Sequence, residues 1–143
     1  MKRKNKKGSV LVEAIISLSI LLLAGVLSTN LLKYMQNSFL MREERESANR
    51  FAYSIENEIK YNLKIEDILN ELDNRDCLKY EFSEENFRKL LTMPLFSLTK
   101  GEGVEIKIKN SNEDNTILLI NITIKDNKGD TISEREFTKT NWI

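Results

Sequence analysis

The chain has 143 residues and equal numbers of basic and acidic side chains, 22 of each, so its formal net charge is zero. It contains no histidine and a single cysteine, Cys77. An internal disulfide is therefore excluded, and the usual general base near neutral pH and the commonest metal ligand are both missing.

The basic residues are concentrated at the N-terminus. Residues 1–8 hold five of them and no acidic residue; the five are Lys2, Arg3, Lys4, Lys6 and Lys7. Removing these five from 22 leaves 17 basic against 22 acidic side chains in the remainder. An acidic body argues against direct binding of nucleic acid, which requires a basic surface.

Residues 10–32 follow as a run of 23 almost wholly apolar residues, VLVEAIISLSILLLAGVLSTNLL, in which Glu13 is the one charge. As a helix the run would extend about 35 Å, enough to cross a hydrocarbon core of about 30 Å. Lysine and arginine beside a span stay in the cytoplasm. The pattern predicts a single-pass membrane protein with its N-terminus inside and its C-terminus outside.

Three simpler interpretations compete for this run. A cleaved secretory signal has a shorter apolar region and a small-residue cleavage site; Ala24-Gly25 offers such a site, but apolar residues resume after it. A buried core helix fits poorly because every face lacks charge. An uncleaved signal anchor fits the length and the flanking charge. Glu13 helps to choose among these interpretations. Inserting a charged carboxylate into hydrocarbon costs about 2.5–3.5 kcal/mol, so an acid within a membrane span is by default functional.

The residues from Gly8 to Glu13, GSVLVE, behind a basic leader resemble the cleavage motif of type IV prepilins. The continuation AIISLSIL resembles that of minor pilins and type II secretion pseudopilins. In that family, prepilin peptidase cuts after the glycine and methylates the new amine. The resemblance covers roughly the first 35 residues. One residue departs from the family pattern, because Ser9 stands where phenylalanine is usual.

The resemblance implies that Gly8 and Ser9 flank the processed bond and that Glu13 pairs with the N-terminal amine of a neighbouring subunit. A buried acid and a buried amine satisfy each other only when subunits pack together, and either one alone is penalised. Glu13 is therefore expected to set the register of assembly rather than to add net stability.

Beyond residue 32 the helix is expected to continue as an amphipathic spine. Its apolar positions recur at helical spacing with Phe51 beside them; they are Met41, Ala48, Ala52, Ile55, Ile59 and Leu63. The charged run at residues 42–46 is interpreted as a solvated stretch between membrane and domain.

The remaining elements are shorter. A weak helical pattern covers residues 62–76, an alternating strand pattern covers 78–82, and Ser83 is a candidate N-cap of a helix through Leu91 that Pro94 terminates. Alternation at 104–109, 116–125 and 131–138, with turns at 111–115 and 126–130, predicts a three-stranded antiparallel meander. A helix across such a sheet gives an α+β fold, which also matches the pilin globular domain.

The sequence holds no phosphate-binding loop, nucleophile elbow or cysteine pair, so neither an enzyme nor a cofactor or metal is expected. Asp126, Asp130 and Glu134 leave a calcium loop open as the lesser alternative to an ordinary hairpin turn. Cys77 is interpreted as a small buried residue. Asn121 begins a glycosylation sequon inside a predicted strand and carries little weight, and Trp142 is expected to pack under the sheet or contact a partner.

These patterns predict a minor pilin or pseudopilin, processed by prepilin peptidase and assembled with other subunits into a type IV pilus-like filament. Its parts are a leader at 1–8, a transmembrane and assembly helix at 9–33, and an exported pilin-like domain at 34–143. The expected location is the cytoplasmic membrane, then a filament at the cell surface. The alternative is an uncleaved, single-span anchored binding or sensor domain, in which Gly8 and Glu13 have no role.

Overall fold

The computed structural model describes residues 6–72, 77–112, 114 and 116–140, with side chains described from residue 10 onward. Trp142 lies outside the described residues, as do positions 113 and 115 of the turn expected at 111–115. The chain divides into two compact units, Met1–Arg42 (unit 1) and Glu43–Ile143 (unit 2).

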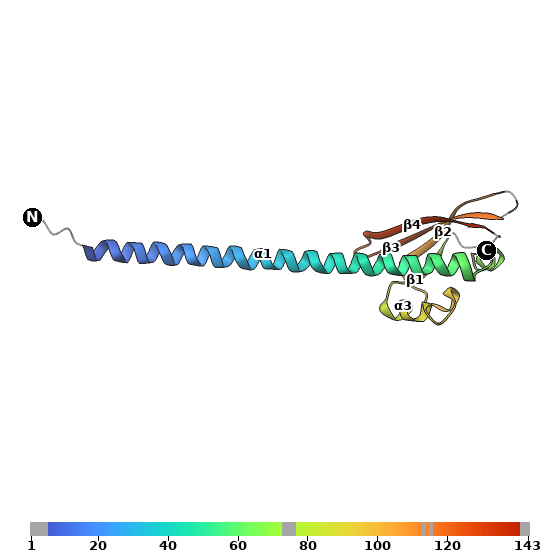
Figure 1. Cartoon of the computed structure of the whole chain (residues 1–143), viewed down its shortest axis with the longest axis horizontal. Helices are drawn as coiled ribbons and strands as arrows, with labels where there is room; N and C mark the ends of the chain where they lie inside the picture. Colours follow the sequence, from blue (N-terminus) through green and yellow to red (C-terminus); the bar gives the residue numbers. More distant parts are fainter. Residues whose placement is uncertain (1–5, 73–76, 113, 115, 141–143) are drawn as a thin grey trace, which may run out of the picture. The chain divides into compact units, whose positions relative to one another are not determined.

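The N-terminal helix α1 spans Lys6–Asn57 and passes directly into a π-helix, η1, at Glu58–Asn62 (Figure 1). No proline interrupts the segment, since the one proline of the chain is Pro94. The predicted continuation of the helix beyond residue 32 is confirmed. The short helix α2, Ile65–Leu72, follows and buries both of its terminal residues together with Ile68.

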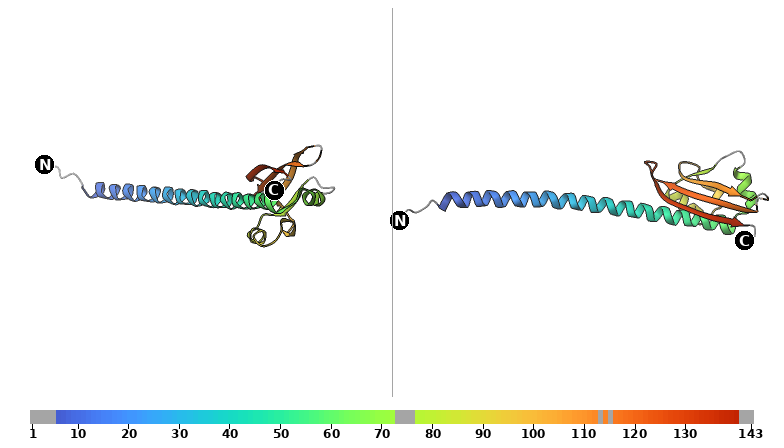
Figure 2. Two further views of the ribbon diagram at one scale, coloured as in Figure 1. Left: turned by 45° about the vertical axis from the view of Figure 1, so that its right-hand side comes forward. Right: turned by 90° about the horizontal axis from the view of Figure 1, so that it is seen from above.

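The described residues contain one antiparallel sheet with strand order β1-β2-β3-β4 (Figures 1 and 2). The strands are β1 at Leu78–Glu81, β2 at Gly103–Ser111, β3 at Ile117–Lys125 and β4 at Thr131–Thr140. The last three form the expected meander, whereas the prediction of about three strands was wrong by one. The additional strand is β1, which pairs with β2 and places Leu78 opposite Ile106.

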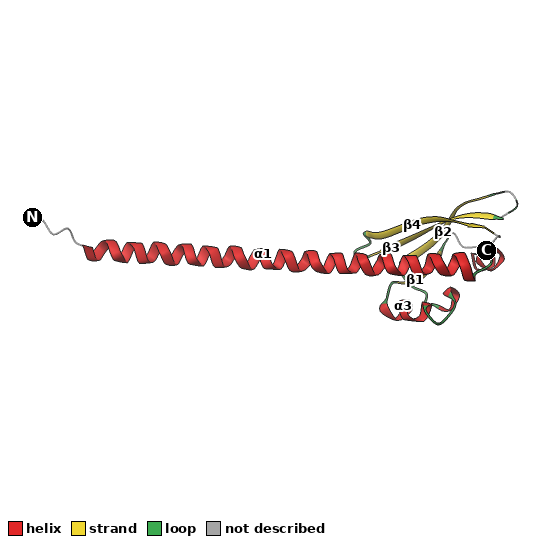
Figure 3. Ribbon diagram, viewed as in Figure 1, coloured by secondary structure: helices red, strands yellow, loops and turns green. Residues whose placement is uncertain are grey.

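The strand pattern predicted at 78–82 is therefore confirmed as β1, but its place in the sheet was not predicted, because an interruption separates it from the meander. Helix α3, Glu84–Leu90, and the 3-10 helix η2, Leu95–Ser97, separate β1 from β2 along the chain (Figure 3). The predicted N-cap is confirmed, since the backbone N–H of Asn86 donates to the Ser83 hydroxyl at 3.3 Å.

The core of unit 2 lies between one face of the sheet and the helical residues of this unit. The helical side is lined by Ala48, Phe51, Ala52, Ile55 and Ile59, each at most 1% exposed. The sheet side centres on four fully buried side chains of β3; these are Leu118, Ile120, Ile122 and Ile124. The apolar stripe of the helix thus packs against the apolar face of the sheet, which gives a two-layer α+β fold.

One position of the predicted stripe does not belong to this core. Met41 is 57% exposed and falls within unit 1, whose described residues are all helical, so no sheet of that unit covers it. The buried stripe therefore begins at Ala48, after the charged run.

Polar side chains also join β4 to the helical residues of unit 2. The Ser133 hydroxyl donates to Asn49 Oδ1 at 2.7 Å. Lys139 is 2% exposed and donates from Nζ to the Lys60 carbonyl oxygen of η1 at 2.6 Å. Burial lowers the pKa of Lys139. Buried polar contacts of this kind have a defined geometry, and they therefore fix how β4 lies along the helix.

Candidate functional site

Unit 1 presents a helix with an exposed apolar surface. From residue 10 to residue 41 every side chain is exposed, and the large apolar residues of this stretch are 46–72% exposed. The helix is long and apolar enough to cross a membrane. A surface of this size without polar cover is typical of a segment that meets lipid or another protein.

Three hydroxyl groups of the apolar run in this helix are satisfied locally. Ser19 and Ser28 donate to the backbone carbonyls one turn earlier, both at 2.8 Å, and Thr29 donates to the Val26 carbonyl at 2.9 Å. Hydroxyls that bond back to the preceding turn need no water. These three residues of the apolar run are therefore compatible with hydrocarbon.

Glu13 is the charged exception in the apolar run. It is exposed on α1 and makes no ion pair with any side chain that the structure describes. Gly8 and Ser9 lie in the first turns of the same helix. The three predicted site residues thus share one helical segment, in which Glu13 follows Ser9 by about one turn.

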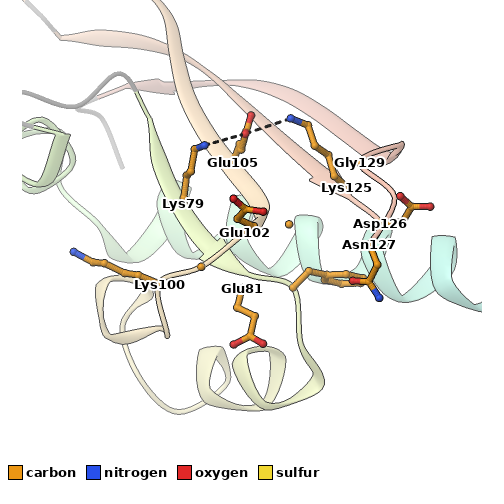
Figure 4. Close-up of a pocket in the computed structure, with 12 residues that line it drawn as sticks. Lys79, Glu81, Lys100, Glu102, Glu105, Lys125, Asp126, Asn127 and Gly129 are labelled. Atoms are coloured by element: carbon orange, nitrogen blue, oxygen red, sulfur yellow. Dashed lines mark ion pairs between the residues drawn. The ribbon is translucent and has the colours of Figure 1, made fainter.

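Unit 2 contains a cleft of about 730 Å³ at the end of the sheet where the loop before β2 meets the turn between β3 and β4 (Figure 4). Its lining is mainly charged, and Glu105 has three lysine neighbours. Glu105 Oε1 lies 3.6 Å from Lys79 Nζ and 3.3 Å from Lys125 Nζ, and Glu105 Oε2 lies 3.3 Å from Lys107 Nζ.

The electrostatics of Glu105 reflect two opposing effects. Burial raises the pKa of this carboxyl, but hydrogen bonds and charge interactions with Lys125 and Lys107 outweigh burial, so the net pKa shift is downward. Glu105 is therefore ionised and neutralised by its own neighbours. This is the arrangement of a structural charge cluster rather than of an acid or base poised near neutral pH.

Two glycines shape one wall of the cleft. Gly103 has φ +110°, and a Cβ there would lie 2.8 Å from Phe82 Cβ. A Cβ at Gly101 would lie 3.0 Å from Glu81 Cβ. The loop approaches the end of β1 so closely that side chains at these two positions would force it to shift.

The three acids considered for calcium do not form a shared site. Asp126 Oδ1 accepts the backbone N–H groups of Lys128 and Asp130, as in a polar turn, and Glu134 accepts a hydrogen bond from Asn121. Within the part of the chain that the structure describes, no cluster of three or more potential metal ligands occurs. Asn121, the sequon residue, is 5% exposed within β3.

Two buried polar residues of unit 2 were not anticipated from the sequence. Asn86 is fully buried, donates to the carbonyls of Glu81 and Thr99, and accepts the Thr99 N–H. Glu56 is 7% exposed and accepts hydrogen bonds from Lys60 at 2.7 Å and Arg135 at 2.6 Å. An asparagine in the first turn of a helix and a glutamate in an amphipathic helix are both common. The sequence around Asn86 and Glu56 therefore gives no sign that they bond to residues far along the chain.

Comparison of the chain with protein-family models, with curated proteins and with solved structures gave no match. Its function is therefore inferred from the residues of the chain and from their geometry.

Proposed function

We propose that the chain is a minor pilin or pseudopilin, which resides in the cytoplasmic membrane and is assembled through its N-terminal helix into a type IV pilus-like filament. The observation that carries the proposal is an exposed apolar helix with one carboxylate near its N-terminal end, Glu13, which has no ion-pair partner among the described side chains. Lipid covers apolar side chains but offers no cation within hydrocarbon, so Glu13 needs a partner that brings one.

The proposal gives each feature of the N-terminus a role. The basic residues of the leader hold the N-terminus in the cytoplasm. Prepilin peptidase cuts between Gly8 and Ser9, and the new amine of Ser9 is the cation that meets Glu13 of a neighbouring subunit. An amine and a carboxylate that are both desolvated are strongly favoured together and strongly disfavoured apart, so the pair selects one register between helices.

Assembly then consists of moving the helix from lipid into a bundle of similar helices. Van der Waals packing replaces lipid contacts at little net cost, because lipid chains and apolar side chains are similar environments. Unit 2 is exported with the C-terminus and contacts neighbouring subunits outside the membrane. It needs no chemistry of its own for this role.

The cleft of unit 2 favours a second candidate function. An uncleaved single-span protein with an extracytoplasmic binding or sensor domain would use such a cleft, whereas a filament subunit has no requirement for one. Under this alternative the Gly8–Ser9 bond stays intact and Glu13 has no assembly partner.

Processing at Gly8 separates the two functions. The intact mass and N-terminal peptide of the membrane-bound chain are measured with and without a co-expressed prepilin peptidase, and with a Gly8→Ala control. We expect a mature chain that starts at Ser9, only with the peptidase and only with Gly8 present. A full-length chain beside an active peptidase would overturn the pilin-like function and leave the uncleaved anchor.

A further inference from the structure

The two edges of the sheet in unit 2 differ in length. The edge strand β1 has four residues, whereas β4, the edge strand on the other side, has ten. The edge of a sheet presents a row of backbone N–H and C=O groups to which an extended chain can bind, and proteins usually keep such edges short or covered. The long edge is therefore the one that needs an explanation.

The short edge at β1 is covered by the chain that follows it. Neighbouring residues of a strand direct their backbone groups to opposite sides, and Phe82 donates to the Glu102 carbonyl beside the start of β2. The backbone N–H of Glu81 therefore points away from β2, where it donates to the Thr99 carbonyl at 3.1 Å. The Glu81 carbonyl accepts a hydrogen bond from the Asn86 side chain at 2.8 Å.

The edge at β4 is long and regular. Among the described residues, β4 pairs with β3 alone and forms the rim of the sheet (Figure 2). Its register with β3 is unbroken from Ser133 to Thr140, which is about 27 Å of strand. This stretch contains neither proline nor glycine. Alternate residues of it therefore direct their backbone groups away from β3.

Two cations of β4 that face the helical layer do not block this edge. Inward-pointing charges are one device that protects edge strands. In this chain, however, Arg135 Nε donates to Glu56 Oε2 and Lys139 Nζ donates to the Lys60 carbonyl, both at 2.6 Å. Because the helical layer already binds both cations, an added strand would not have to desolvate a free charge.

Side chains on the outer face of β4 define part of the chemistry of a partner. Glu134, Glu136 and Thr138 are exposed there, on the face opposite to the buried Phe137. Neighbours of opposite charge and pairs of hydroxyl residues across two strands stabilise a sheet. Lysine and threonine therefore suit the positions opposite these three residues.

On the inner face, the ring of Tyr53 borders the edge. Counted from Ala48 in the core, Glu56 lies about 80° around the helix and Tyr53 about 140°. Since Glu56 bonds to β4, Tyr53 lies beyond β4 on the side of the edge. Tyr53 is 54% exposed, and its ring centre is 5.3 Å from the guanidinium carbon of Arg135. An apolar side chain of an added strand would pack on this ring.

A second copy of β4 is a poor partner for this edge. Antiparallel pairing centred on residue 136 places Glu136 opposite itself, and pairing centred on residue 135 places Glu134 opposite Glu136. Pairing centred on residue 137 places Arg135 opposite Lys139. Like charges directly opposite each other destabilise a sheet. The central registers are thus unfavourable, and a chain of different sequence fits better.

We propose that the outer edge of β4 binds an extended segment of another protein as an additional strand, in which lysine or threonine alternates with apolar residues. The backbone of β4 supplies the affinity, whereas Glu134, Glu136 and Tyr53 select the sequence. The inference concerns unit 2 alone, so it holds whether or not the chain is processed at Gly8.

Hydrogen exchange of backbone amides tests this edge. The full chain is kept in a non-ionic detergent, and the probe is an eight-residue peptide in which lysine and threonine alternate with valine, as long as the unbroken register of β4. Exchange is measured by mass spectrometry with and without the peptide. We expect exchange in residues 131–140 to slow several-fold. The same peptide with all its amides N-methylated cannot add as a strand and should give no protection.

A matched pair of variants tests the selection of sequence. Glu136→Gln removes a carboxylate at the edge, whereas Lys109→Gln breaks the same ion pair from strand β2. Both positions are exposed, so both chains should fold. The Glu136→Gln chain should bind the peptide several-fold more weakly than the parent chain, and the Lys109→Gln chain should bind it at least as tightly as the parent chain.

Several results would overturn the inference. No protection of residues 131–140, or equal protection by the N-methylated peptide, would remove the edge as a binding site. Protection confined to the residues of the cleft would show that the peptide binds there by charge. Protection of residues 131–140 that grows with chain concentration in the absence of peptide would assign the edge to a second copy. Equal binding by the two variants would contradict the role of Glu136.

Discussion

Ile20 and Ile122 have identical side chains and opposite surroundings. Ile20 lies in unit 1 and is 61% exposed, whereas Ile122 lies in unit 2 and is fully buried. Unit 2 buries its apolar residues between helix and sheet and so supplies its own core. Unit 1 leaves its apolar residues on the surface, so its cover must come from lipid or from another chain. The difference separates a unit that is complete by itself from a unit that needs a partner.

The largest expected effect follows from removing unit 1. Deletion of residues 1–42 should release the chain from the membrane fraction and leave a soluble, folded unit 2, because the core of unit 2 begins at Ala48. Carbonate extraction of membranes followed by circular dichroism of the released fragment measures both properties. An insoluble or unfolded fragment would show that unit 2 depends on unit 1 for its stability.

A matched pair of substitutions sharpens the same comparison. Ile122→Ala should lower the free energy of unfolding of unit 2 by about 2–5 kcal/mol, because it leaves a cavity in a packed core. Ile20→Ala removes the same atoms from an exposed position and should leave that free energy unchanged. Denaturant titration of the detergent-solubilised full chain, followed by a signal from the sheet, compares the two variants. Similar losses would contradict the separate roles of the two units.

The buried amide of Asn86 is expected to have a smaller effect. Asn86→Ala removes three hydrogen bonds that join the end of β1, helix α3 and the backbone of Thr99. Leaving buried carbonyl and N–H groups without partners costs about 1–3 kcal/mol. Thermal unfolding beside the exposed control Asn127→Ala measures the difference. A loss no greater than that of the control would mean that water replaces the amide.

The smallest expected effect concerns pH and Glu56. Burial raises the pKa of Glu56, but hydrogen bonds from Lys60 and Arg135 outweigh burial and lower the pKa below its ordinary value of 4.5. A carboxyl whose pKa is lower in the folded state stabilises the fold above the unfolded value. That contribution is lost as the pH falls below about 4.5 and through the folded pKa.

Glu56→Gln tests this linkage. The variant should be less stable than the parent chain near neutral pH by about 1 kcal/mol, because it loses a charged hydrogen bond. The gap should narrow as the pH falls through the range in which Glu56 is protonated. Unfolding curves at a series of pH values from neutral down to about 3 show the trend. A gap that is constant with pH would refute the ionic role of Glu56.

Patterns within a few residues could be read from the sequence. The apolar run at 10–32, the N-cap Ser83 and the alternation of β2, β3 and β4 all depend on neighbours along the chain, and the structure has each of these elements. Gly8, Ser9 and Glu13 were selected from spacing and resemblance, and their proposed roles involve other molecules.

Features that depend on distant partners could not be read in this way. Strand β1 pairs with a strand that begins more than 20 residues later, and its four residues give too short a pattern to reveal the pairing. Glu56 and Arg135 are 79 residues apart. Met41 fits the helical spacing of the core residues, yet spacing does not tell where a sheet begins to cover a helix. Which distant residues pair, and where along the helix burial begins, are decided only when the whole chain folds.

The behaviour of Glu13 in assembly is the most direct test of the proposed function. Chains with Glu13 or with Glu13→Gln are expressed in cells that hold the filament machinery, and the chain is quantified in sheared filament and membrane fractions. We expect that the Glu13→Gln chain is inserted and processed at Gly8 like the parent chain but remains in the membrane fraction. Equal incorporation of both chains into filaments would contradict the role of Glu13 as the register-setting partner of a neighbouring amine.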